Sequence, residues 1–202
     1  MRKSTPLRTQ ILTKVAHKIG FEYMDKDSWG IESLLKDFYL FRKGRRRQIR
    51  HLMQKKDGLM ETNMYIFDYH FIKGYGNNSK RMAQTVFFID SRKLGLPQFL
   101  MQPEKFFNKA ANWIGIQKDI DFVDYPKFST QYQLNGDDED FIRYSIKPDF
   151  LHFFSFEQGW TLEGLNYFLI IYRKNRLITA DSIEVLHGKG MHILKMLRTE
   201  NL

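Results

Sequence analysis

The sequence predicts an α+β fold, in which an antiparallel sheet, built from a meander plus a C-terminal hairpin, carries helices packed mainly on one face. Stretches with the helical spacing of apolar residues alternate along the chain with stretches in which every second residue is apolar. The composition is 43% hydrophobic, with 18 Phe and 10 Tyr among 202 residues, which is enough apolar surface for a core. Short loops between neighbouring β-type stretches favour antiparallel pairing.

The first helix is predicted over about 6–19. Pro6 suits the first turn of a helix, where its missing N–H costs nothing, and apolar residues recur at every fourth position from Leu7 to Ile19. Gly20 follows the last of these residues and is well suited to ending the helix.

A short helical turn and a β-hairpin are predicted next. Residues 28–36 carry the apolar residues of one such turn. The aromatic and apolar run at 38–41, then Gly44, then residues 48–54 predict two strands joined by a turn.

The most regular alternation lies in residues 61–73, which predict a long strand. The Gly- and Asn-rich segment 74–79 predicts a loop to a further strand over 82–90, so the two strands form an antiparallel pair. The two faces of the first strand are Met64, Ile66, Asp68, His70 and Ile72 on one side and Tyr65, Phe67, Tyr69 and Phe71 on the other.

The second half predicts helices separated by extended segments. Pro103 and an apolar stripe that reaches Ile114 predict one helix, and residues 119–122 and 128–134 are expected to be extended. Four acidic residues at 137–140 predict the start of another helix, because negative charge is favoured at a helix N-terminus.

The C-terminal part begins with Pro148, which interrupts this helix and starts a new turn. Residues 160–163 and 166–173 predict a hairpin, and its second strand, almost wholly apolar, is expected in the middle of the sheet. Thr179 is expected to cap a last amphipathic helix.

Length and composition limit the class of protein. The chain fits one domain over 1–202, and the alternative is two strand-then-helix halves that meet near residue 116. Because it contains no Cys, a disulfide framework, a thiolate metal site and a Cys nucleophile are excluded. No apolar run approaches the roughly 18 residues that span a bilayer, and no secretory signal is present. We therefore expect a cytoplasmic protein with no transmembrane segment.

The excess positive charge is confined to the N-terminal part. Residues 1–60 hold 15 Lys and Arg against 6 Asp and Glu, whereas residues 61–202 hold 17 of each. The segment 42–56 contains no acidic residue, and it predicts either a site for the phosphate groups of nucleic acid or of an anionic membrane surface, or a solvated edge strand. Its cations are Arg42, Lys43, Arg45, Arg46, Arg47, Arg50, Lys55 and Lys56.

The aromatic face of strand 61–73 has two interpretations. Beside a basic hairpin it resembles a platform on which the bases of a single-stranded nucleic acid stack. The same side chains can instead form core beneath the helices, which we favour because no strand carries the basic, Gly and aromatic pattern of an RNA-recognition motif.

Candidates for catalysis are few. Asp68 and His70 share one strand face, and with Tyr69 they form an alternative site, for a small ligand or an enzyme reaction. The six His include no pair at a spacing that places two imidazoles on one helix face, and the acidic run at 137–140 lacks the pattern of a calcium loop. The sequence thus predicts no metal, no cofactor and no catalytic residue, and it favours a protein that is not an enzyme.

The order of landmarks along the chain resembles an uncharacterised bacterial protein family of unknown function. This resemblance runs from about residue 7 to the C-terminus. In similar proteins the domain often follows N-terminal membrane-spanning helices, which this sequence does not contain, and the family supplies an architecture without an activity, a ligand or a catalytic residue. The matching motifs are Phe38-Tyr39-Leu40-Phe41, Ile66-Phe67-Asp68-Tyr69, Gln84-Thr85-Val86, Pro97, Pro103-Glu104, Asp119-Ile120-Asp121-Phe122, Pro126-Lys127-Phe128-Ser129, Tyr132-Gln133-Leu134-Asn135-Gly136-Asp137-Asp138-Glu139, Gly159-Trp160 and Tyr172-Arg173.

The function expected from the sequence is that of a non-catalytic binding or interaction domain. Its basic N-terminal hairpin would contact an anionic partner, either a nucleic acid or a membrane surface, through residues 42–56. A peripheral position at the inner face of the membrane is compatible with this expectation. A homo-oligomeric module and a dispersed ligand site around Asp68 and His70 are the alternatives.

Overall fold

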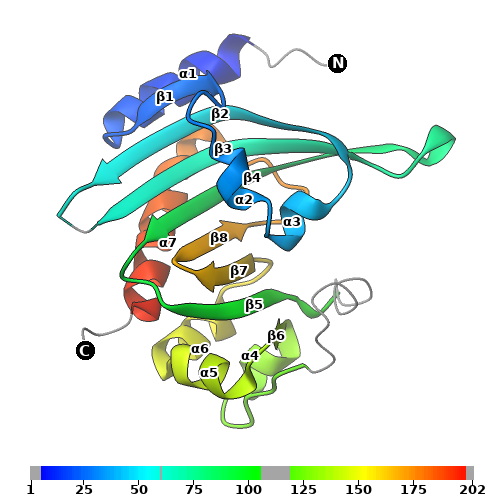
Figure 1. Cartoon of the computed structure of the whole chain (residues 1–202), viewed down its shortest axis with the longest axis vertical. Coiled ribbons are helices and arrows are strands. Elements are labelled where there is room, and N and C mark those ends of the chain that lie inside the picture. Colours follow the sequence, from blue (N-terminus) through cyan, green and yellow to red (C-terminus); the bar gives the residue numbers. More distant parts are fainter. Residues whose placement is uncertain (1–5, 60, 106–118, 199–202) are drawn as a thin grey trace.

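A single antiparallel sheet of eight strands forms the centre of the computed structural model, which describes residues 6–59, 61–105 and 119–198 (Figure 1). The strand order is β1-β2-β3-β4-β8-β7-β5-β6, so the sheet includes strands from both sides of residue 116. The strands are β1 (Glu22–Lys26), β2 (Arg45–Asp57), β3 (Thr62–Lys73), β4 (Lys80–Ser91), β5 (Leu96–Pro103), β6 (Tyr132–Gly136), β7 (Thr161–Asn166) and β8 (Phe168–Tyr172).

Helices cover the two faces of this sheet unequally. The α-helices are α1 (Pro6–Lys18), α2 (Glu32–Leu35), α3 (Tyr39–Arg42), α4 (Pro126–Gln131), α5 (Glu139–Ser145), α6 (Pro148–Phe156) and α7 (Ile183–Leu197), and short 3-10 turns lie at Gly76–Asn78 and Ala180–Ser182. Side chains of α1 and α4 to α7 share the larger core cluster with one face of the sheet, whereas α2 and α3 contribute to a second cluster on the other face. The predicted α+β fold with helices mainly on one face is confirmed.

The alternation predicted for strand 61–73 decides which side chains enter which core. Met64 and Ile66 of β3 lie in the larger cluster, on the side of α1 and α7. The aromatic residues Tyr65, Phe67, Tyr69 and Phe71 all lie in the second cluster, with Leu40 and Phe41 of α3. The aromatic face is therefore core beneath α2 and α3, as favoured from the sequence.

The prediction of a strand at 38–41 is wrong. Residues 38–41 are all buried, and Tyr39–Arg42 forms the short helix α3. A run of four apolar residues has no period of its own, so helix and strand cannot be distinguished from it. Strand β2 therefore pairs with β3 and with β1, a strand over Glu22–Lys26 that the sequence did not predict.

The extended segment predicted over 128–134 is also only partly correct. Pro126 begins α4, which ends at Gln131, and the strand β6 begins at Tyr132. Residues 119–122 are not part of a strand, although Ile120 N donates to Leu134 O.

Two further predictions concern the ends of elements. Pro103 is the last residue of β5, residues 104–105 form a 3-10 turn, and residues 106–114 of the predicted helix lie outside the described residues. The turn of the C-terminal hairpin falls at Asn166, in the left-handed region with φ 53°, two residues after the predicted position.

The remaining helices lie where the sequence pattern predicts them, but Thr179 precedes the 3-10 turn Ala180–Ser182 and does not cap α7, which begins at Ile183 after Ser182. Helix α5 begins after Asp138, whose side chain accepts a hydrogen bond from Phe141 N, and Pro148 is the first residue of the next helix, α6. Helix α7 contains Gly190, at which a Cβ atom would lie 1.8 Å from the ring of Phe87. That glycine permits the close approach of α7 to β4. Among the described helices, none combines the length and the apolar character needed to cross a bilayer.

Candidate anion-binding site

The cations of segment 42–56 are divided between the two faces of the sheet. Register shifts between Arg45 and Gln48 and between Arg50 and Met53 interrupt the alternation of β2, with Arg46 and His51 in the left-handed region. The segment therefore does not form one basic face.

The cations in the second half of the segment lie on different faces of the sheet. Arg50 lies opposite Asp68 and donates to Gln48, and Lys55 lies opposite Met64 with its amine near the ring of Phe21. Both cations thus lie on the face of α1. Lys56 is directly opposite Asn63, so its side chain projects from the other face of the sheet, the face of α2 and α3.

The cations near α2 and α3 interact with those helices. Arg42 forms an exposed ion pair with Asp37, with 3.3 Å between Nη2 and Oδ1. The guanidinium of Arg47 donates to the carbonyl oxygen of Phe41. The structure therefore separates Arg42, Arg50, Lys55 and Lys56 from the start of β2.

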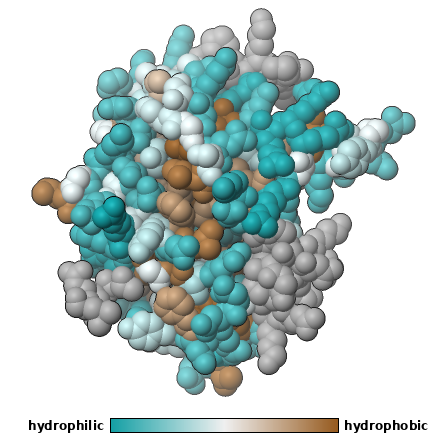
Figure 2. All heavy atoms as spheres, viewed as in Figure 1, coloured by the Kyte–Doolittle hydropathy of each residue, from teal (hydrophilic) through white to brown (hydrophobic). Residues whose placement is uncertain are grey.

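The start of β2 packs beside the loop end of the β3–β4 hairpin, and together they form one projecting structure. In Figure 1 this hairpin extends well beyond the rest of the sheet, and Figure 2 shows its surface as mainly hydrophilic. Residues 71–89 contain no Asp or Glu, as is also true of 42–56. We call this structure the basic arm; it consists of Arg45, Arg46, Arg47, Lys73, Tyr75, Lys80 and Arg81.

Contacts between the two segments hold the arm together. Arg45 lies opposite Ile72, its guanidinium donates to Gly74 O and Ser79 Oγ, and it stacks 5.2 Å from the ring centroid of Tyr75. Lys73 and Lys80 are directly opposite each other. The tip carries Tyr75, which is 81% exposed.

Gly44 sets the position of the arm relative to α3. It has φ 70°, and a Cβ atom there would lie 2.4 Å from the ring of Phe71 and 2.6 Å from Ile72 O. Any other residue would clash with β3 and strain the backbone. This glycine therefore allows the chain to turn from α3 into β2 directly against the hairpin.

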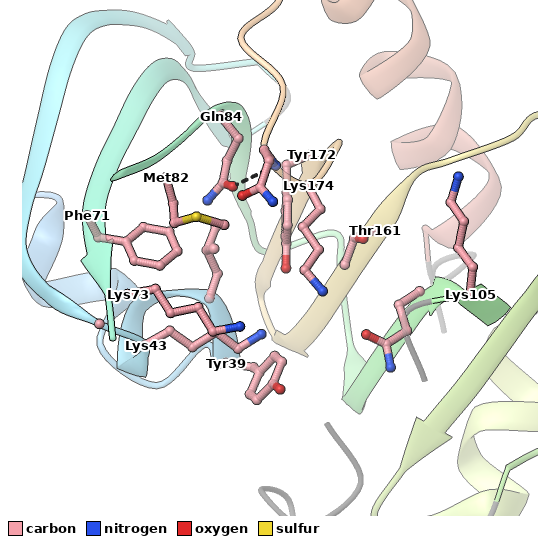
Figure 3. Close-up of a pocket in the computed structure, with 14 residues that line it drawn as sticks. Tyr39, Lys43, Phe71, Lys73, Met82, Gln84, Lys105, Thr161, Tyr172 and Lys174 are labelled. Carbon is pink, nitrogen blue, oxygen red and sulfur yellow. Dashed lines mark hydrogen bonds between the residues drawn. The ribbon is translucent and has the colours of Figure 1, made fainter. Parts of the chain in front are cut away.

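A pocket of about 430 Å³ opens at the base of the arm, between β3, β4, β8 and α3. In Figure 3 the amines of Lys43, Lys73 and Lys174 point toward a common space above the ring of Tyr39, whereas that of Lys105 points away from it. The lining residues are Tyr39, Leu40, Lys43, Gly44, Phe71, Lys73, Met82, Gln84, Gln102, Lys105, Thr161, Tyr172, Lys174 and Asn175.

The electrostatics of this pocket centre on Lys43. Its amine lies 3.2 Å from the ring centroid of Tyr39. Burial lowers the pKa of Lys43 well below its usual range; the negative charge of Glu163 opposes this shift, and the like charges of Lys174 and Lys73 add to it. An anion in the pocket would relieve that repulsion.

Glu163 lies behind the pocket wall and is 2% exposed. Its Oε1 accepts hydrogen bonds from Tyr172 Oη at 2.8 Å and from Leu40 N at 3.2 Å. Burial raises the pKa of Glu163 above its usual range, and the bond from Tyr172 and the charge of Lys43 oppose the rise. The carboxyl group therefore anchors α3 to β7 and β8 beneath the lysines.

Gln84 supplies a further polar group on the pocket wall. The side chain is 1% exposed, and its Oε1 accepts a hydrogen bond from Asn175 N at 3.1 Å (Figure 3). Its Nε2 has no hydrogen-bond partner among the described residues. A buried amide of this kind gains free energy when an acceptor reaches it.

The structure does not bring Asp68, Tyr69 and His70 together as a site. Asp68 is 2% exposed and accepts from both Arg8 and Thr85, so its two oxygens are already occupied. Tyr69 points to the opposite face of β3, into the second core cluster. Within the described ranges, no three His, Asp or Glu side chains gather closely enough to hold a metal ion.

Sequence reasoning missed the cations that complete the site. Lys73, Lys80 and Arg81 could have been found, because the strands at 61–73 and 82–90 and the loop between them already place these residues side by side at one end of a hairpin. Lys174 had no such signal, since its position depends on the pairing of β8 with β4, in which residues as far apart in the chain as Val86 and Tyr172 are partners.

A similar fold is found in the crystal structure of the mycobacterial trehalose monomycolate transport factor A, TtfA. The two share a TM-score of 0.62 and 11% sequence identity, over 95% of this chain and 92% of that chain. At this identity the similarity concerns the fold alone. No protein-family model and no curated protein matches the sequence.

Proposed function

We propose that this protein is a non-catalytic binding domain that docks on an anionic membrane surface through the basic arm. The observation that carries the proposal is the joining of two acid-free segments, 42–56 and 71–89, at one projecting end of the molecule. Arg46, Arg47, Lys73, Lys80 and Arg81 are all exposed there. Such clusters attract anionic lipid head groups with about 1 kcal/mol for each Lys or Arg near the surface.

Two observations favour a membrane over a nucleic acid. The aromatic side chains that would stack on bases, such as Phe67 and Tyr69, are buried in the core. The exposed aromatic residue of the arm is Tyr75 at its tip, and Tyr is enriched where proteins meet the lipid head groups.

The test is co-sedimentation of the protein with vesicles. The vesicles contain phosphatidylcholine, either alone or with roughly 30% phosphatidylglycerol, which makes their surface anionic. Binding of the protein to single-stranded RNA is measured in parallel by a filter-binding assay. The arm variant is Arg46→Asn with Lys80→Gln and Arg81→Gln, in which Asn tolerates the left-handed backbone at position 46.

The matched control removes three exposed cations elsewhere, in Lys14→Gln, Lys127→Gln and Lys195→Gln. We expect wild type and control to bind the anionic vesicles, with roughly 100-fold weaker binding by the arm variant. Binding should also decrease steeply with salt. Equal binding to neutral vesicles, equal loss in both triple variants, or tighter binding to RNA than to vesicles would contradict the proposal.

A further inference from the structure

The pocket at the base of the arm combines two kinds of wall. One side presents the amines of Lys43, Lys73 and Lys174 toward a common space (Figure 3). An apolar part of the lining adjoins these amines and is formed by Leu40, Phe71, Met82 and the ring of Tyr172. Its volume of about 430 Å³ lies within the range of small-molecule sites.

We propose that this pocket is a second binding site, which takes a single amphiphilic molecule with an anionic head group, a carboxylate or a phosphate monoester, and an apolar body. The head group lies among Lys43, Lys73 and Lys174, and the apolar body lies against Phe71 and Met82. This site goes beyond docking on a membrane surface, because it encloses one molecule.

The requirement for an anion follows from the placement of the lysines. The amines of Lys43, Lys73 and Lys174 converge on one space, in which burial desolvates Lys43 and the charges of Lys174 and Lys73 repel it. The acidic group that acts on Lys43 is Glu163, and the like charges of Lys174 and Lys73 act on Lys43 in the opposite sense. An incoming anion would therefore add negative charge at the point toward which these amines are directed.

The requirement for an apolar body follows from the apolar part of the lining. Met82 is half-buried there and packs against the second core cluster, to which the neighbouring Leu40, Phe71 and Tyr172 belong. A small inorganic ion would leave this part of the lining in contact with water, whereas an alkyl chain would cover it.

The test is isothermal titration calorimetry of the full chain with four probes. Decanoate and decyl phosphate, used below the concentrations at which they form micelles, carry the two candidate head groups. Decanol lacks the charge, and inorganic phosphate lacks the chain. The pocket variant is Lys43→Gln with Lys174→Gln, and the matched control is Lys80→Gln with Arg81→Gln, which removes two cations from the arm outside the pocket.

We expect at least one of the two anionic amphiphiles to bind wild type and the arm control alike, and the pocket variant about tenfold or more weaker. Decanol and inorganic phosphate should bind far more weakly, and the tighter of the two amphiphiles identifies the head group. Lys73→Gln alone should also weaken binding of the amphiphile. Because Lys73 is exposed, this substitution should leave the folded structure intact.

Three results would overturn the pocket proposal: no binding of either amphiphile, unchanged binding by the pocket variants, or inorganic phosphate binding as tightly as decyl phosphate. Failure here is distinguishable from failure of membrane docking. The vesicle assay depends on Lys80 and Arg81, whereas titration with the amphiphiles depends on Lys43 and Lys174.

Discussion

Arg8 of α1 holds Asp68 of β3 with two parallel hydrogen bonds, from Nε at 2.8 Å and from Nη2 at 3.0 Å. Thr85 donates to the same carboxylate, and Arg8 also donates to Ile178 O. The ion pair therefore joins α1, two central strands and the segment before α7.

Arg8→Ala should consequently destabilise the protein. Asp68 is 2% exposed, so the substitution leaves a buried charge with Thr85 as its remaining donor, at a cost of about 3 kcal/mol. Urea denaturation measures this loss. The control is Lys18→Ala, which removes the exposed ion pair with Glu184 and should cost at most about 1 kcal/mol. Equal effects of the two substitutions would show that Arg8 has no structural role.

The two glycines of α7 should respond in opposite ways to Ala. At Gly190 the added methyl group would lie 1.8 Å from the ring of Phe87, so Gly190→Ala should destabilise by about 1 to 3 kcal/mol through overpacking. At Gly188 the methyl group would meet nothing within 4 Å, and Gly188→Ala should stabilise by up to about 1 kcal/mol. Thermal unfolding of the two variants distinguishes them. A stable Gly190→Ala would mean that α7 does not approach β4 this closely.

Glu163 should make stability depend on pH. Its folded-state pKa lies above the ordinary value of 4.5, so between 4.5 and neutral pH the folded protein retains a proton that the unfolded chain releases. Wild-type stability therefore decreases as pH rises through this window.

Glu163→Gln removes that titration and keeps an oxygen that can accept from Tyr172 and Leu40. Relative to wild type, the variant should gain stability between pH 5 and pH 8, by at most about 1.4 kcal/mol per pH unit. The measurement is urea denaturation of both proteins across this range. Parallel pH profiles would show that Glu163 titrates normally.

The sequence predicted the parts of the fold in which local pattern and burial agree. Strand 61–73 alternates between two cores, so its faces could be assigned from a period of two. In α7 the apolar stripe was sufficient for a helix despite Gly188 and Gly190. The run at 38–41 is buried on all sides, and such a run carries no period.

The basic site depended on information that the local sequence lacks. The cations of 42–56 are contiguous in the chain, but the left-handed residues Arg46 and His51 divide them between the faces of β2. Conversely, Lys43 and Lys174 are far apart in the chain but line the same pocket, because β8 pairs with β4. Charge density in sequence therefore indicated the right region, while pairing of distant strands determined which cations act together.

The central claim is that the arm tip, not some other basic surface, meets the membrane. The chain has no Cys, so an environment-sensitive fluorophore can be attached at a single introduced Cys. We would compare Tyr75→Cys, at the arm tip, with Leu59→Cys, at the opposite end of the β2–β3 pair, where the side chain is 96% exposed. On addition of anionic vesicles, we predict a blue-shifted, brighter emission from the label at position 75 and an unchanged spectrum at position 59. A shift at position 59, or no shift at position 75 while the protein sediments with the vesicles, would contradict the account.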